Sequence, residues 1–60
     1  MLFIAIISDS ENIVIREACF SILTSAYEWL YANKINAPGW GAVIVNTQTH
    51  RVVIDASWMA

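Results

Sequence analysis

Apolar and polar residues divide the chain into two strand-like stretches at each end and one helix-like stretch between them. Residues 2–8 (LFIAIIS) are rich in β-branched and aromatic side chains, which favour a strand. Residues 13–20 start with three consecutive β-branched residues, which disfavour a helix start, whereas residues 16–18 would suit a helix. We predict a second strand here, with an early helical extension over residues 12–20 as the alternative. The polar residues between the two stretches then form a hairpin loop.

The middle of the chain has the spacing of an amphipathic helix. From Ser21 onward the apolar residues recur three and four positions apart, which predicts a helix over about residues 22–34. Ser21 is expected to cap the first turn. Asn36-Ala37-Pro38-Gly39 should end the helix, because proline cannot continue it and glycine accepts the turn geometry. The residues that define the apolar side are Ile22, Leu23, Ala26, Tyr27, Trp29, Leu30 and Ile35.

The last third of the chain predicts a second hairpin. Residues 40–45 and 51–58 are rich in strand-forming side chains and flank the polar residues 46–50. Loops of this length often need a positive φ near their end, and His50 is expected to adopt it, because histidine tolerates that region better than most residues. We therefore interpret the only histidine as a turn residue rather than a catalytic one.

The predicted order is strand, strand, helix, strand, strand. This order gives an α+β domain of two layers, ββαββ, with one helix on one face of an antiparallel sheet, and residues 1–60 form a single small domain. Alternation along each strand should place polar residues on the sheet face without the helix, but the strands of this chain are apolar on both faces. In the first strand Leu2, Ile4 and Ile6 point one way and residues 3, 5 and 7, also apolar, point the other. Val52 and Ile54 are expected to share a face, opposite Val53. The sheet should therefore be covered on its second face by another polypeptide.

Composition strengthens the expectation of a partner. The chain has 60 residues, of which 58% are apolar and 13% charged, and a domain this small has a thin core. Small proteins compensate with disulfides, metals or association. The single cysteine, Cys19, excludes an internal disulfide, and with only one histidine a Cys/His zinc site is not available within one chain. Association remains, with a homodimer as the expected oligomer.

Charge and hydropathy exclude other classes of partner. The net charge is −2 and the three cations, Arg16, Lys34 and Arg51, are far apart, so nucleic acid is not expected to bind. No apolar run approaches the ~20 residues that span a bilayer, and no membrane partner is expected. Residues 1–7 lack the basic start of a signal peptide. The lone thiol favours a reducing compartment, and we predict the cytoplasm.

Aromatic residues are the best candidates for recognition, because tryptophan and tyrosine are enriched at the energetic centres of protein interfaces. Trp29 and Trp40 have an equally weighted alternative role, which is to fill the core beneath the helix. Trp58 is expected to lie in an interface, so Trp58→Ala should weaken association without unfolding the chain. The predicted partner-binding residues are Trp58, Trp40, Tyr31, Phe3, Ile44 and Val53.

No catalytic, metal or cofactor site is predicted. The acidic residues do not form a spaced pair of acid and base, and Asp9 and Glu11 are expected to lie in a solvated turn. Cys19 is interpreted as a buried small hydrophobic residue. The glycines at 39 and 41 precede a strand, whereas a phosphate-binding loop precedes a helix. We therefore predict a protein that is not an enzyme.

The element order, the helix entered through Phe20-Ser21, and a closing hairpin of residues 42–45 and 51–55 resemble the compact proteins of bacteriophages. Among these, the pattern is similar to the Dmd-type phage antitoxins. The resemblance implies a non-catalytic protein that binds and inhibits a host protein, either a toxin or an anti-phage defence enzyme, in the host cytoplasm. The alternative is a homo-oligomer that binds or sequesters a small metabolite or nucleotide between subunits. A third class, a small enzyme or structural subunit with a site completed between chains, would need substrate turnover that His50→Ala abolishes.

Overall fold

The computed structural model describes residues 2–35 and 37–56. The strands are β1 (Phe3–Ser8), β2 (Val14–Phe20), β3 (Gly41–Asn46) and β4 (Arg51–Asp55), and the helix α1 (Leu23–Asn33) lies between β2 and β3 in the chain. The ββαββ order and the α+β class predicted from the sequence are confirmed. Residues 14–20 form a strand, so the helical alternative for this stretch is wrong.

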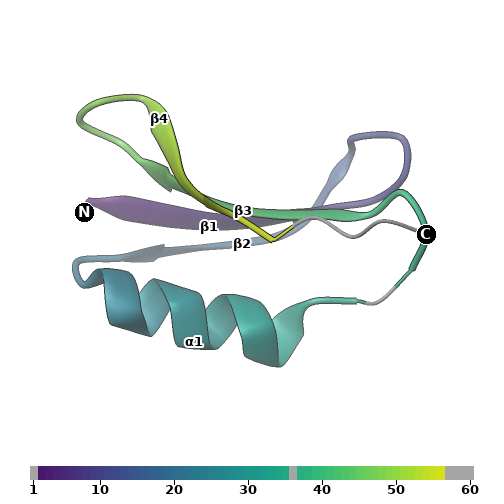
Figure 1. The fold of residues 1–60 in the computed structure, drawn as a ribbon, viewed down its shortest axis with the longest axis horizontal. Coiled ribbons are helices and arrows are strands. Elements are labelled where there is room, and N and C mark those ends of the chain that lie inside the picture. Colours follow the sequence, from purple (N-terminus) through teal and green to yellow (C-terminus); the bar gives the residue numbers. More distant parts are fainter. Residues whose placement is uncertain (1, 36, 57–60) are drawn as a thin grey trace.

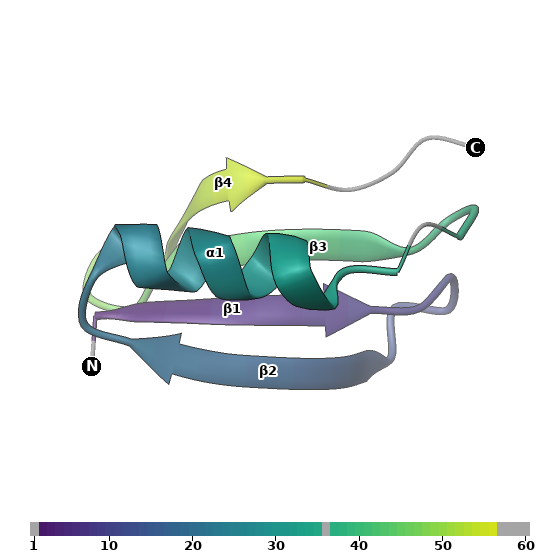
Figure 2. The same cartoon turned by 90° about the horizontal axis from the view of Figure 1, so that it is seen from below.

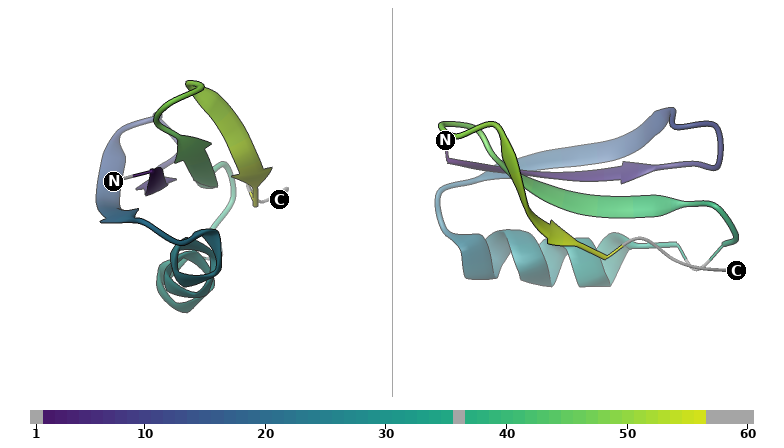
Figure 3. Two further views of the ribbon diagram at one scale, coloured as in Figure 1. Left: turned by 90° about the vertical axis from the view of Figure 1, so that its left-hand side faces the viewer. Right: turned by 45° about the horizontal axis from the view of Figure 1, so that its top comes forward.

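The strands form one antiparallel sheet in the order β2-β1-β3-β4. The strands of each hairpin are neighbours, and β1 pairs with β3 across the middle. Figure 1 shows α1 along one side of this sheet, and Figure 2 shows it lying over the central strands. The end-on view in Figure 3 shows no described element on the opposite side. The fold therefore has two layers and one uncovered sheet face.

The core lies between α1 and the two central strands. Ala26 and Leu30, one helical turn apart, are fully buried against the sheet. Small alanines on both layers let the helix approach closely, while larger side chains fill the space between them. The fully buried residues are Ala5, Ile7, Ala26, Leu30, Ala42 and Ile44.

The helix ends differ from the sequence prediction at one point. Its N-cap is Ile22 and no side chain caps the first turn, so the predicted capping role of Ser21 is wrong. At the other end the backbone N–H of Lys34 bonds the carbonyl of Leu30 at 2.9 Å, and the Asn33 amide donates to the carbonyl of Trp29 at 2.8 Å. The first bond satisfies the carbonyl of Leu30, one of the last four in the helix, which lack a partner within it. The second bond ties the side chain of the last helical residue back to the preceding turn.

Both hairpin loops are held by local hydrogen bonds. In the first loop, Oδ1 of Asp9 accepts the backbone N–H groups of Glu11 and Ile13 at 2.9 and 3.0 Å, as expected of a turn built around an aspartate. In the second loop the side chain of Asn46 accepts the N–H groups of residues 48 and 49. His50 has a φ of 57°, which confirms its predicted turn role.

Each outer strand is interrupted by a shift in pairing. In β2 the register passes from Ile7–Arg16 to Ser8–Val14 and skips residue 15. In β4 it passes from Ile44–Ile54 to Val45–Val52 and skips Val53. Val52 therefore faces away from the helix while Ile54 packs against the core, and the prediction that these two share a face is wrong. Alternation in the sequence does not reveal a bulge, because the extra residue changes the face of everything beyond it.

Candidate partner-binding surface

The sheet face opposite α1 is built from two cross-strand rows. Residues directly opposite each other in antiparallel strands present their side chains on the same face. One row runs from β2 to β4 through Glu17, Ile6, Val43 and Asp55, and the second row runs through Cys19, Ile4, Val45 and Val52. We call these eight residues the uncovered face. Its centre is apolar, and both ends of the first row are carboxylates.

The apolar side chains of the uncovered face are not shielded by any described element. Ile4, Ile6, Val43 and Val45 are half-buried by one another on the two central strands, and Val52 on the outer strand is 57% exposed. Adjacent β-branched side chains cover part of each other even without a second layer. The exposed remainder is a continuous apolar strip across β1, β3 and β4.

Two predicted contact residues lie on the side of the sheet that α1 covers. Ile44 is fully buried beneath α1, so its prediction as a partner-binding residue is wrong. Phe3 lies on the same helix-covered side and is partly buried against the core, which also makes its side chain a packing residue. The sequence pattern showed two apolar faces but contained no signal for which one the helix covers.

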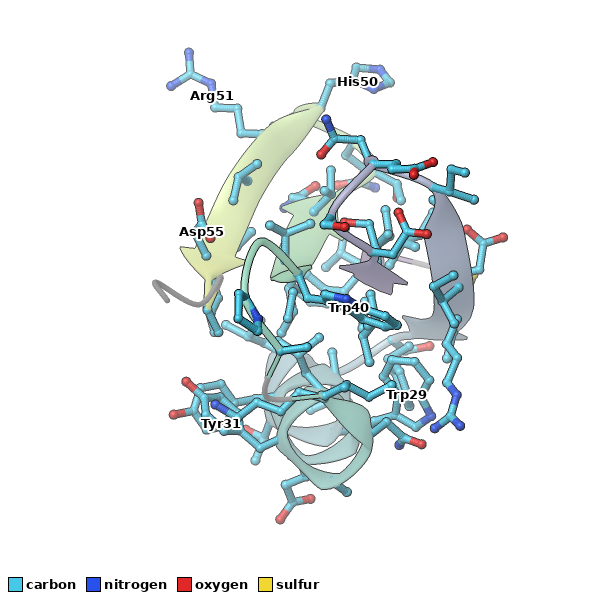
Figure 4. All side chains as sticks on the ribbon, turned by 90° about the vertical axis from the view of Figure 1, so that its right-hand side faces the viewer. Trp29, Tyr31, Trp40, His50, Arg51 and Asp55 are labelled. Atoms are coloured by element: carbon cyan, nitrogen blue, oxygen red, sulfur yellow. The ribbon has the colours of Figure 1, made fainter. Side chains whose placement is uncertain are left out.

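The other predicted residues are spread over the molecule. Trp29 and Trp40 both pack partly buried against the core, and the Trp29 ring lies 6.1 Å from the ring of Phe20. Figure 4 shows these two tryptophans on one side of the helix and Tyr31 on the other. Val53, in the β4 bulge, is 42% exposed. Trp58 lies outside the described residues. The predicted contacts therefore do not converge on one surface.

An aromatic pair lies on the outer side of α1. The rings of Tyr27 and Tyr31, one turn apart, are 4.5 Å apart, and Nζ of Lys34 lies 4.8 Å from the centre of the Tyr31 ring. The hydrogen bond with Tyr27 raises the pKa of Tyr31 above its ordinary value, with smaller contributions from desolvation and from the charge of Tyr27. This group stabilises the last turns of the helix by contacts at helical spacing.

Cys19 is exposed, so its interpretation as a buried residue is wrong. It lies opposite Ile4 on an outer strand, where only one neighbouring strand can shield it. Cys19 and Glu17 were missed as members of a surface, because their face follows from the pairing register with β1. The strand order and register, which the sequence does not determine, are needed to place Cys19 and Glu17 on the uncovered face.

Within residues 2–35 and 37–56, there is no pocket and no cluster of three or more side chains suited to a metal ion. Over the same residues no helix has both the length and the apolar character needed to cross a membrane. Comparisons with protein-family models, with curated proteins and with solved structures give no significant match to this chain.

Proposed function

We propose that the chain is a non-catalytic binding protein that uses the uncovered face to bind and inhibit another protein. The observation that supports this proposal is the apolar part of the two rows, which lies across the sheet without a covering layer among the described residues and consists of Ile6 and Val43 in the first row and Ile4, Val45 and Val52 in the second. Contiguous exposed apolar surface of this kind marks sites of protein association.

The two outer strands argue for binding through the face rather than through an edge. Strand β2 carries the charged residues Arg16 and Glu17, and strand β4 begins with Arg51 and ends with Asp55. Both strands also contain a shift in pairing. Charges and bulges on outer strands hinder the addition of a further strand. A partner is therefore expected to stack on the sheet.

The target that we propose is a host toxin or defence enzyme, met in the cytoplasm of a host cell. A protein that acts by covering another protein needs neither a pocket nor a metal. The alternative is a homo-oligomer that holds a small ligand between subunits. It would use the same uncovered face, but a second copy of the chain rather than a different protein would cover it.

Site-specific photocrosslinking tests the proposal. A photoreactive amino acid replaces Val43 on the uncovered face in one sample and Glu28 on the exposed side of α1 in another. Crosslinking in bacterial lysate, followed by reconstitution with the identified protein, should give one protein adduct from position 43 and none from position 28. Val43→Glu should then abolish binding to the purified target and leave the circular dichroism spectrum unchanged. Equal adducts from both positions, or binding that survives Val43→Glu, would overturn the proposal.

A further inference from the structure

Exposed apolar side chains gather at two corners of the uncovered face. Among the described residues, eight large hydrophobic side chains are exposed, and five of them lie where β2 and β4 begin. These five, which we call the apolar corners, are Ile13, Val14 and Ile15 at β2, and Val52 and Val53 at β4. The side chains in the middle of the face are only half-buried, but each of the five is 42–57% exposed. The corners therefore expose more apolar surface per residue than the centre.

The shifts in pairing explain the position of these corners. Ile15 and Val53 are the residues that the register skips in β2 and β4. An extra residue in one strand bends that strand and increases its local twist. In Figure 1 the first residues of β2 and β4 lie farther from α1 than the middle of the sheet does, and their last residues lie nearer to α1. Each apolar corner is thus raised beside the uncovered face, on the side away from the helix.

The apolar corners are continuous with the uncovered face. Val14 lies opposite Ser8, and Ser8 lies opposite Gly41 on β3. Ser8 follows Ile6 by two residues in β1, so this third row is on the same face as Ile6. Val52 belongs to the second row and joins the other corner in the same way. The rows and both corners therefore form one surface.

The size of the sheet indicates that a stable partner must also contact the corners. A face of four strands, each five to seven residues long, measures on the order of 400 Å², since strands lie ~4.8 Å apart and rise ~3.3 Å per residue. Each partner in a standard protein interface buries about 800 Å². A partner that covers the rows alone would bury too little surface, so contacts at the apolar corners have to supply part of the rest.

We infer that the target places an amphipathic helix across the uncovered face, with its apolar side in contact with both apolar corners. This inference rests on the proposed function and names the element that the target supplies. The centre of the face consists of Ile4, Ile6, Val43 and Val45, whose side chains offer no hydrogen bonds. A helix satisfies its backbone groups internally, whereas a strand would need a pairing partner that the outer strands of this sheet hinder. The same sheet already carries a helix on its other face (Figure 2).

A second copy of the chain does not pair the apolar corners with each other. Two copies stacked face to face are related by a two-fold axis that lies between the sheets. Such an axis places each raised corner over the end of β2 or β4 of the other copy, which bends the other way (Figure 1). The side chains that these strand ends present on the uncovered face are Cys19 and Asp55. The most exposed apolar residues therefore need a different protein to cover them.

Photocrosslinking from both corners tests the geometry. The photoreactive amino acid replaces Ile13 in one sample and Val53 in another, and the adduct sites are mapped by mass spectrometry on the target identified from position 43. The longest dimension of the chain is 30 Å and a helix rises ~1.5 Å per residue, so both sites should fall in one helical segment, no more than about 20 residues apart. Sites in separate segments of the target, or on a second copy of the chain, would overturn the inference.

Two matched variants test the contribution of a corner to affinity. Ile13→Ser removes a side chain that is 55% exposed at the β2 corner, and Ile22→Ser makes the same change at a residue that is 62% exposed before α1. Ile13→Ser should weaken binding to the purified target roughly 5- to 30-fold, the range of central interface residues, and Ile22→Ser should leave it unchanged. Val53→Ser repeats the test at the other corner. Equal affinity of the Ile13→Ser and Ile22→Ser variants would overturn the inference.

The two proposals fail in different ways. Equal crosslinking from positions 43 and 28 removes the binding face itself. A target that is crosslinked from position 43 but not from position 28, and that binds Ile13→Ser and the wild type equally, keeps the binding face and removes the contact at the corners.

Discussion

Gly39, in the loop before β3, approaches Ser10, in the loop between β1 and β2, so closely that a Cβ at residue 39 would lie 3.0 Å from the Cβ of Ser10. Gly39 also has a φ of 81°, a conformation that other residues rarely adopt. The contact joins two loops that lie at the same end of the sheet. Gly39 is therefore required both by its conformation and by its neighbour.

Gly39→Ala should destabilise the fold by about 1–2 kcal/mol, because it adds a strained backbone conformation to a steric contact. Urea denaturation followed by circular dichroism measures the loss. In the Ser10→Gly background the contact is absent and only the backbone cost remains, so the loss should be smaller there. An identical loss in both backgrounds would show that the contact with Ser10 contributes nothing.

The two faces of β1 should respond differently to the same deletion. Ile7→Ala removes a fully buried side chain beneath α1 and should cost about 2–5 kcal/mol, which is enough to unfold a domain of this size. Ile6→Ala removes the same atoms from the uncovered face and should cost less than half as much. Thermal melts of the two variants give the comparison. If Ile6→Ala were as costly as Ile7→Ala, the side chain of Ile6 would be as well buried as that of Ile7, which would contradict an uncovered face.

The sequence predicted this architecture well because its signals were local. The helix is recognisable from apolar residues at a spacing of three and four, and the second hairpin from two β-rich runs around residues 46–50. Local sequence does not determine which face of the sheet the helix covers. Residues 3 and 5–7 are apolar on both sides of the strand, so only the packing of Ala26 and Leu30 against Ala5 and Ile44 determines which side becomes the core.

The bulges were unpredictable for a related reason. A bulge such as that at Val53 depends on how the strand twists against its neighbour, and nothing in the residues 51–55 distinguishes it from regular alternation. The carboxylates at the two ends of the first row could not be predicted from the sequence either. Glu17 and Asp55 are 38 positions apart in the chain (55 − 17), and they share a row only because β1 and β3 pair between their strands.

Tyr31 should ionise at a higher pH than an isolated tyrosine. The hydrogen bond with Tyr27 raises the pKa of Tyr31, so removing it by Tyr27→Phe should lower the pKa of Tyr31 toward its ordinary value of 10.0. A raised pKa in the folded state means that the contribution to stability is complete below the unfolded pKa and is lost as the pH rises through the folded pKa. Absorbance of tyrosinate during an alkaline titration measures the shift, and a pKa of Tyr31 that does not change in Tyr27→Phe would contradict this reading.

His50 offers a test of the turn in the second hairpin. Its φ of 57° suits glycine, so His50→Gly should leave the stability equal to the wild type or up to about 1 kcal/mol higher. His50→Val should lower it by about 1–2 kcal/mol, because a β-branched residue at positive φ is strained. Chemical denaturation of both variants provides the measurement, with Thr49→Val as a control for added β-branching in the same loop. A valine tolerated equally at positions 49 and 50 would argue against the positive φ.

The interrupted and charged outer strands have a consequence for how the molecule meets its neighbours. Growth of the sheet sideways, copy after copy, is the usual route from small β-rich proteins to fibres. Here charges and pairing shifts hinder strand addition at both outer strands, β2 and β4. The apolar sheet face opposite α1, in contrast, has no described element over it. Copies in a crowded solution are thus hindered from joining edge to edge, and each still offers the open face of its sheet to a partner that fits it.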